Sequence, residues 1–212
     1  MKLTRKEVGQ LCAAVVLAIV IALALRSHRP LGQNVGDNSL ARAVREDQSS
    51  PAEINPAADL TLVVFTDYRC PACRAAHPAM KRAVATDGKV RIIYKDWPIF
   101  GAASTRAAQI AIASSFQGIY PLVHDRLMSG RTDSEHALRD AVEQSGGDWR
   151  RLQGDLASNR KLITAHLARN GKQAFELGLP GTPGYLIGPI LVRGALSEAD
   201  FRRVFREARD AG

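Results

Sequence analysis

Residues 60–73 read LTLVVFTDYRCPAC, an apolar run that leads directly into two cysteines separated by two residues. The run is almost continuously apolar, which is typical of a strand in a sheet that is covered on both faces. The proline after the first cysteine suits the first position of a helix, because its φ is already fixed and its missing N–H would have had no partner. The stretch therefore predicts a buried strand over 60–66 and a helix that begins at Pro71.

Cys70 is placed at the N-terminus of that helix, where two features favour its thiolate. Unpaired backbone N–H groups and the positive end of the helix dipole face the sulfur, and Arg69 adds a neighbouring positive charge. The thiolate is the reactive form of cysteine. We therefore predict thiol–disulfide exchange, with Cys70 as the exposed catalytic nucleophile and Cys73, buried one turn on, as the catalytic thiol that resolves the mixed disulfide. Pro71 and Ala72 complete the first turn of this active-site helix.

The composition is that of a globular protein with one working cysteine pair. The chain has 212 residues, 46% of them apolar, three cysteines and a net charge of +8. The basic residues are scattered, so we expect a solvated basic surface and no nucleic-acid partner. Cys12 lies in an apolar segment and is interpreted as a small hydrophobic residue. We expect no resident metal and no cofactor besides the redox-active disulfide between Cys70 and Cys73.

Residues 1–26 resemble a signal-anchor or transmembrane segment. A basic start is followed by an unbroken apolar run over 11–25. This length falls between the core of a signal peptide and a full membrane span. Residues 22–24 could form a cleavage site, but Arg26 follows closely, so an uncleaved anchor is favoured and a cleaved signal stays open. Either would place the remainder across a membrane, in an oxidising compartment.

The remainder divides into a tether and one folded domain. Residues 27–58 contain many Pro, Gly and Ser residues and predict a flexible tether, with a short helix expected within 38–47. Residues 59–210 predict an α/β domain. After the first strand and helix, we expect a strand over 90–95, a helical insertion at about 102–178, strands over 185–187 and 190–192, and a helix over 197–209.

Five parts of the sequence resemble the DsbA-type family of exported thiol–disulfide oxidoreductases. They are residues 65–73 (FTDYRCPAC), 95–98 (KDWP), 104–108 (STRAA) and 177–183 (LGLPGTP), and Gly194. The resemblance covers about residues 59–210. It implies a thioredoxin fold, a βαβ unit followed by a ββα unit, with an inserted all-helical domain.

The resemblance also implies a substrate-binding loop. The Thr182-Pro183 peptide bond would be cis, and the loop would face the cysteines and offer its backbone to an extended substrate peptide. Thr182 and Pro183 are therefore the expected substrate-binding residues. Gly184 departs from the family, which usually has a residue with a side chain there, and this predicts a looser loop.

The function that the resemblance implies is the introduction of disulfides into reduced exported proteins. A DsbB-like, quinone-coupled membrane partner would reoxidise the cysteine pair. A disulfide isomerase or reductase of the same fold is the alternative, with a DsbD-like partner supplying electrons to a reductase. The expected location is the bacterial inner membrane, with a single span and the catalytic domain in the periplasm, or the soluble periplasm if the signal is cleaved.

Three further residues near the cysteines have two interpretations each. His77 lies four residues after Cys73 on the same helix face. It could join the cysteines in a copper or zinc site, which keeps a metal-binding thiol protein open, although zinc would need a fourth ligand. A partly exposed helix histidine is favoured. Asp67 and Tyr68 are expected to shape the loop before Cys70, with the lining of a substrate groove as the alternative.

Overall fold

The computed structural model of the chain describes residues 6, 14–18 and 30–212. Of the expected membrane segment at 1–26, only residues 6 and 14–18 are among them. In the part of the chain that is described, no helix is both long and apolar enough to cross a membrane. Residues 1–31 and 32–212 form separate units, and the fold below is that of residues 32–212.

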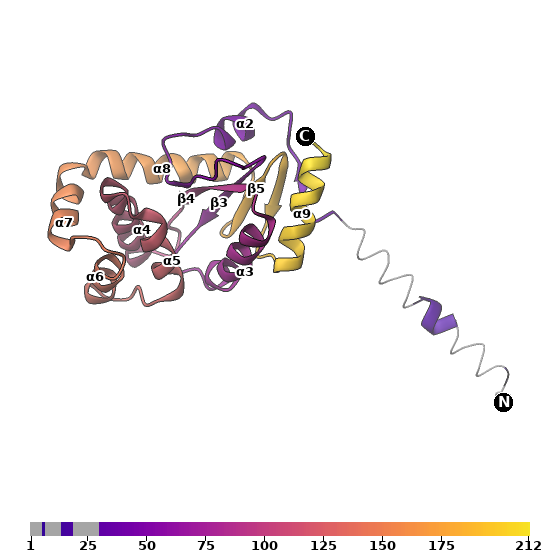
Figure 1. The fold of residues 1–212 in the computed structure, drawn as a ribbon, viewed down its shortest axis with the longest axis horizontal. Coiled ribbons are helices and arrows are strands. Elements are labelled where there is room, and N and C mark those ends of the chain that lie inside the picture. Colours follow the sequence, from indigo (N-terminus) through magenta and orange to yellow (C-terminus); the bar gives the residue numbers. More distant parts are fainter. Residues whose placement is uncertain (1–5, 7–13, 19–29) are drawn as a thin grey trace. The chain divides into compact units, whose positions relative to one another are not determined.

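A mixed sheet of six strands forms the centre of this unit, in the order β1-β6-β5-β3-β4-β2 (Figure 1). The neighbours β3 and β4 are parallel, whereas β5 runs antiparallel to both β3 and β6. The strands are β1 (Gln33–Asn34), β2 (Ala52–Glu53), β3 (Leu60–Thr66), β4 (Val90–Asp96), β5 (Gly184–Ile187) and β6 (Ile190–Arg193).

The helices complete the predicted βαβ and ββα units. Helix α3 connects β3 to β4, the helices from α4 to α8 connect β4 to β5, and α9 follows β6. Their bounds are α2 (Ser39–Arg45), α3 (Pro71–Asp87), α4 (Ala102–Ser114), the 3₁₀ helix η1 (Ser115–Gln117), α5 (Tyr120–Ser129), α6 (Glu135–Glu143), α7 (Trp149–Ser158), α8 (Arg160–Glu176) and α9 (Glu198–Asp210). The predicted α/β arrangement with a helical insertion is therefore confirmed.

The two faces of the sheet are covered by different helices. Successive side chains of a strand point to opposite faces. Val63 and Phe65 of β3 are fully buried in a cluster with Ala41 of α2 and Ala174 of α8. The other face of β3 packs against α9, which also lies beside α3. Helix α3, which begins at the carboxyl end of β3, therefore lies on this second face of the sheet together with α9.

In place of the expected flexible tether, the described part of residues 27–58 holds elements of the domain. Strands β1 and β2 form the two edges of the sheet, and the side chain of Asn38 caps the N-terminus of α2. The Asp47 carboxylate pairs with Lys95, whose side chain is fully buried. A buried ammonium group requires a counter-charge, so this segment is tied to the sheet.

Candidate active site

Cys70 and Cys73 lie at the N-terminus of α3 as free thiols. Cys70 is the N-cap, and its Sγ accepts a hydrogen bond from the backbone N–H of Cys73, with 3.3 Å between the two atoms. The backbone N–H of Cys70 donates to the carbonyl oxygen of Asp67 at 3.1 Å. The sulfur of Cys70 therefore occupies the position where helix N–H groups and the helix dipole stabilise negative charge.

The prediction that Cys70 is exposed is wrong. Cys70 and Cys73 each expose 2% of their surface, while Pro71 and Ala72 between them are exposed. The Cys70 thiol donates to the carbonyl oxygen of Thr182 at 3.3 Å, so the loop that carries Thr182 covers the sulfur. Access to Cys70 therefore depends on the position of this loop.

The Cys73 thiol is held in its protonated form. Burial raises the pKa of Cys73 to about 12, and contacts with Thr182, Thr66 and the backbone of Asp67 offset only part of this effect. A thiol with this pKa is almost fully protonated at neutral pH. The two cysteines therefore lie in different environments, one at the helix terminus and one in the protein interior.

The loop that carries Thr182 and Pro183 has the backbone conformation that the family resemblance implies. The Thr182-Pro183 peptide bond is cis, and Pro183 is buried, with its carbonyl oxygen accepting from the N–H of Gly194 at 2.9 Å. Gly184 follows at a point of close packing, because a Cβ there would lie 2.6 Å from Cδ1 of Leu179. Gly184 therefore permits close packing against Leu179, which would have to move if this position carried a side chain.

Asp67 shapes the segment before Cys70, as the sequence predicts. Its side chain is buried, and Oδ1 accepts from the N–H of Arg69 at 2.8 Å and from the hydroxyl of Ser104. Oδ2 accepts from the N–H of Ile99 at 2.6 Å and of Phe100 at 3.2 Å. One carboxylate thus connects the active-site loop, the segment after β4 and the start of α4.

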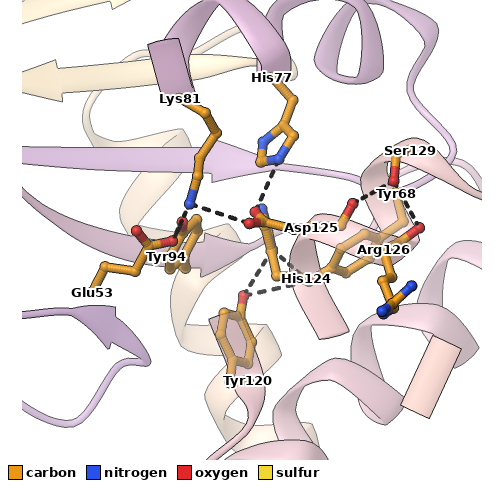
Figure 2. A network of polar contacts seen from close by, with 10 residues as sticks. All are labelled: Glu53, Tyr68, His77, Lys81, Tyr94, Tyr120, His124, Asp125, Arg126 and Ser129. Carbon is orange, nitrogen blue, oxygen red and sulfur yellow. Dashed lines mark hydrogen bonds and ion pairs between the residues drawn. The ribbon is translucent and has the colours of Figure 1, made fainter. Parts of the chain in front are cut away.

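Tyr68 anchors the same segment to the helical insertion through a buried polar cluster (Figure 2). Its hydroxyl lies 2.8 Å from Nδ1 of His124, and the hydroxyl of Tyr120 donates to Oδ2 of Asp96 at 2.9 Å. Burial raises the pKa of Asp96 to about 7 and holds the pKa of His124 well below its usual value. His124 is therefore kept neutral, and the hydroxyl of Tyr68 is held by the side chains of His124 and Tyr120.

His77 differs from the partly exposed histidine that we expect. It is 8% exposed, and its Nε2 lies 3.0 Å from Oδ1 of Asp125, which also pairs with Lys81 at 3.2 Å (Figure 2). His77 therefore joins α3 to α5. Within residues 30–212 and the described residues before them, no group of three or more His, Cys, Asp or Glu side chains could hold a metal ion.

Arg74 has a structural role that the sequence analysis misses. Its guanidinium group donates to the carbonyl oxygens of Tyr68 at 3.2 Å, Leu127 at 2.8 Å and Gly130 at 2.5 Å. Two of these carbonyls lie at the end of α5, more than 50 residues along the chain. No local pattern in the sequence indicates such contacts, since an arginine after CxxC reads as an ordinary exposed helix residue.

Comparison with known proteins agrees with this geometry. A family model described as thioredoxin matches residues 53–206. The chain belongs to the thioredoxin family. It resembles the DsbA-like thiol–disulfide oxidoreductases of that family.

Several solved structures share the fold. A thioredoxin-like oxidoreductase from Silicibacter pomeroyi is 34% identical, with a TM-score of 0.73, over 80% of this chain and 98% of that one. The thiol–disulfide exchange protein alpha-DsbA2 from Wolbachia pipientis is 28% identical, with a TM-score of 0.74, over 80% and 92%. A periplasmic thioredoxin-like protein from Salmonella enterica serovar Typhimurium is 26% identical, with a TM-score of 0.68, over 81% and 96%.

The curated relatives are much longer proteins. They are Na(+)/H(+) antiporters of the NhaA type, and the one from Salinispora tropica is 27% identical over 177 residues, or 81% of this chain. The one from Salinispora arenicola is 26% identical over 177 residues. The chain spans about a quarter of the length of these relatives, 26% of each.

Proposed function

We propose that the protein is an exported oxidase that passes a disulfide between Cys70 and Cys73 to reduced proteins. The observation that carries this proposal is the pair of contacts made by the Cys70 sulfur. It accepts from the Cys73 N–H and faces the Thr182 carbonyl, each at 3.3 Å. The sulfur thus lies between a helix terminus that stabilises a thiolate and a loop whose backbone can receive a substrate strand.

The reaction begins with the oxidised protein and a substrate that carries two thiols. A substrate thiolate attacks the Cys70 sulfur, so that a mixed disulfide forms and the bond to Cys73 breaks. The Cys73 sulfur leaves with the electron pair and takes up a proton. The second substrate thiolate then attacks the substrate sulfur of the mixed disulfide and releases Cys70 as a thiolate. Two electrons move to the protein, and the substrate gains a disulfide.

The environments of the two cysteines support these different roles. The released Cys70 thiolate is stabilised by the N–H of Cys73 at the helix N-terminus. The pKa of Cys73 is raised to about 12 by burial, so this thiol is protonated at neutral pH and does not compete with Cys70 for the first attack on a disulfide. Its role is limited to resolving a mixed disulfide at the adjacent Cys70 sulfur. Stabilisation of the Cys70 thiolate at the helix terminus favours the reduced form of the pair, which makes the disulfide a better oxidant.

Export and a membrane partner belong to the same proposal. The apolar segment at 11–25 supports export or anchoring, and a similar protein from Salmonella enterica is periplasmic. We place the catalytic domain in the periplasm, on a single inner-membrane span or free if the signal is cleaved. A DsbB-like, quinone-coupled partner would restore the disulfide, whereas a reductase would depend on a DsbD-like partner.

Trapping of a mixed disulfide tests the exchange chemistry. Cys73→Ser keeps the attacking thiol and removes the resolving one, so incubation with a disulfide-containing peptide is expected to give a stable mixed disulfide at Cys70. Intact-mass measurement detects the adduct. Cys70→Ser is the matched control and is expected to give none, because its remaining thiol is buried and protonated. Adducts in neither variant would overturn the proposed function.

A further inference from the structure

Helices α4 and α8 pack against each other (Figure 1), and a cavity of about 420 Å³ lies where they meet η1 and the segment before β2. Its volume is in the range of sites that bind small molecules. None of the residues that line it belongs to the active-site segment or to the loop of Thr182. Its walls are mainly apolar and are formed by Pro51, Ile112, Phe116, Leu162, Ile163 and Ala165.

Two polar side chains of α8, His166 and Arg169, also line this cavity. Nη2 of Arg169 lies 3.1 Å from Nδ1 of His166. A guanidinium group can only donate, so Nδ1 of His166 accepts this hydrogen bond. Burial, together with the charges of Arg169 and Lys95, lowers the pKa of His166 to about 4. The ring is therefore neutral at neutral pH and carries its proton on Nε2.

His166 and Arg169 each hold a donor that lacks an acceptor. Among the residues that the structure describes, Nε2 of His166 and Nε of Arg169 are buried and have no hydrogen-bond partner. Buried donors in native proteins are nearly always paired with a protein group, a water molecule or a ligand. This side of the cavity therefore has donors in excess and requires an acceptor.

The charges beside the cavity leave an excess of one positive charge. The Asp47 carboxylate pairs with the Lys95 ammonium group and lies 3.4 Å from Nη2 of Arg169. One anion thus faces two cations, and His166 is neutral. The Arg169 side chain is 40% exposed, so an anion in the cavity can reach it. A guanidinium group presents two parallel N–H donors to a carboxylate.

We propose that this cavity binds a small monocarboxylic acid with a short apolar chain, a fatty acid. The carboxylate pairs with Arg169 and supplies the acceptor that Arg169 and His166 lack. The chain lies against Ile112, Phe116 and Leu162, where it is removed from water. The site is separate from the cysteines, so it adds a binding activity to the proposed function and does not depend on it.

The remaining polar groups favour a fatty acid over the C-terminus of a protein. A peptide would bring amide groups into the cavity, and burial of an amide is unfavourable unless it finds hydrogen-bond partners. Three serines line the cavity. The hydroxyls of two of them, Ser49 and Ser50, already donate to the Asp47 carboxylate. The apolar walls offer an amide no partner.

Titration calorimetry of the full chain with hexanoate and with 1-hexanol tests the site. Hexanoate is expected to bind with a Kd below about 1 mM. Hexanol should bind at least about tenfold more weakly, because it has the same chain without the charge. N-acetyl-leucine, which carries a carboxylate and an amide, should also bind at least about tenfold more weakly than hexanoate. Cys70→Ser should bind hexanoate as the unmodified protein does.

Substitutions at two positions separate the charge from the cavity. Arg169→Met removes the charge and is expected to raise the Kd of hexanoate at least about tenfold, with less than about a twofold change for hexanol. Arg206→Met, at an exposed position of α9, is its control. Ala165→Trp fills the cavity and should weaken binding of both compounds by more than about tenfold. Ala168→Trp, exposed on α8 outside the cavity, is the matched control.

Four results would overturn the inference. Equal Kd values for hexanoate and hexanol would show that the charge has no role. Unchanged binding of hexanoate in Ala165→Trp would place the ligand elsewhere, and this variant decides the matter if Arg169→Met fails to fold. No saturable binding up to about 10 mM would show that water alone fills the cavity. Tighter binding of N-acetyl-leucine than of hexanoate would indicate that a protein C-terminus is the ligand.

Discussion

At the scale of single residues, burial keeps the Cys73 thiol protonated at neutral pH. Burial raises its pKa to about 12, whereas an ordinary cysteine titrates near 8.5. In Cys70→Ser, which leaves this thiol alone at the site, we predict that thiolate absorbance in the ultraviolet appears only above about pH 10. A midpoint between pH 8 and 9 would show that the interior around Cys73 is accessible to water.

A second prediction at the scale of residues concerns Asp96 and the way in which stability depends on pH. Burial raises its pKa to about 7 in the folded state, against about 3.9 when unfolded. The folded state therefore holds the proton more tightly, so this contribution to stability is full below pH 4 and is lost as the pH rises to 7. Asp96→Asn removes this titration.

Denaturant unfolding at pH 5 and pH 8 measures the effect. Over that interval the free energy of unfolding of the unmodified protein should fall by about 2–3 kcal/mol relative to that of Asp96→Asn. Parallel behaviour of the two proteins would show that Asp96 is ionised in the folded state. Asp140→Asn, which alters a half-exposed carboxylate on α6, serves as the control and should follow the unmodified protein.

At the scale of elements, the contact between α3 and α5 holds the active-site helix against the helical insertion. Arg74 donates to the carbonyl oxygens of Leu127 and Gly130, groups that a helix end leaves without partners. Arg74→Ala should lower the free energy of unfolding by about 1–3 kcal/mol. Arg206→Ala, an exposed arginine on α9, is the control and should change it by less than about 0.5 kcal/mol. Equal effects would contradict the role of Arg74.

Elements with local signals could be predicted, and contacts between distant segments could not. The run of apolar residues predicts β3, and Ser197 with Asp200 predicts the capping box that starts α9. Strands β1 and β2 have two residues each, too few for any periodicity. The covering of Cys70 by Thr182 and the pairing of His77 with Asp125 join residues 112 and 48 positions apart, so each depends on the complete fold.

At the scale of the whole molecule, residues 32–58 belong to the folded domain. Ala41 and Val44 are fully buried in the core cluster, and Asp47 neutralises the buried Lys95. Removal of one partner of a buried ion pair costs roughly 3–5 kcal/mol. A fragment that starts at residue 59 should therefore melt at least roughly 10 °C below one that starts at residue 32. Equal melting temperatures, measured by circular dichroism, would mean that the segment contributes little to stability.

The central claim of the account is that the two cysteines form an oxidising disulfide, and their reduction potential tests it most directly. The full chain would be equilibrated with glutathione buffers and the fraction of reduced protein measured. We predict a value near or above about −150 mV, close to that of a strong oxidant such as DsbA at about −120 mV. A value near about −270 mV, as in thioredoxin, would contradict the oxidase and indicate a reductase.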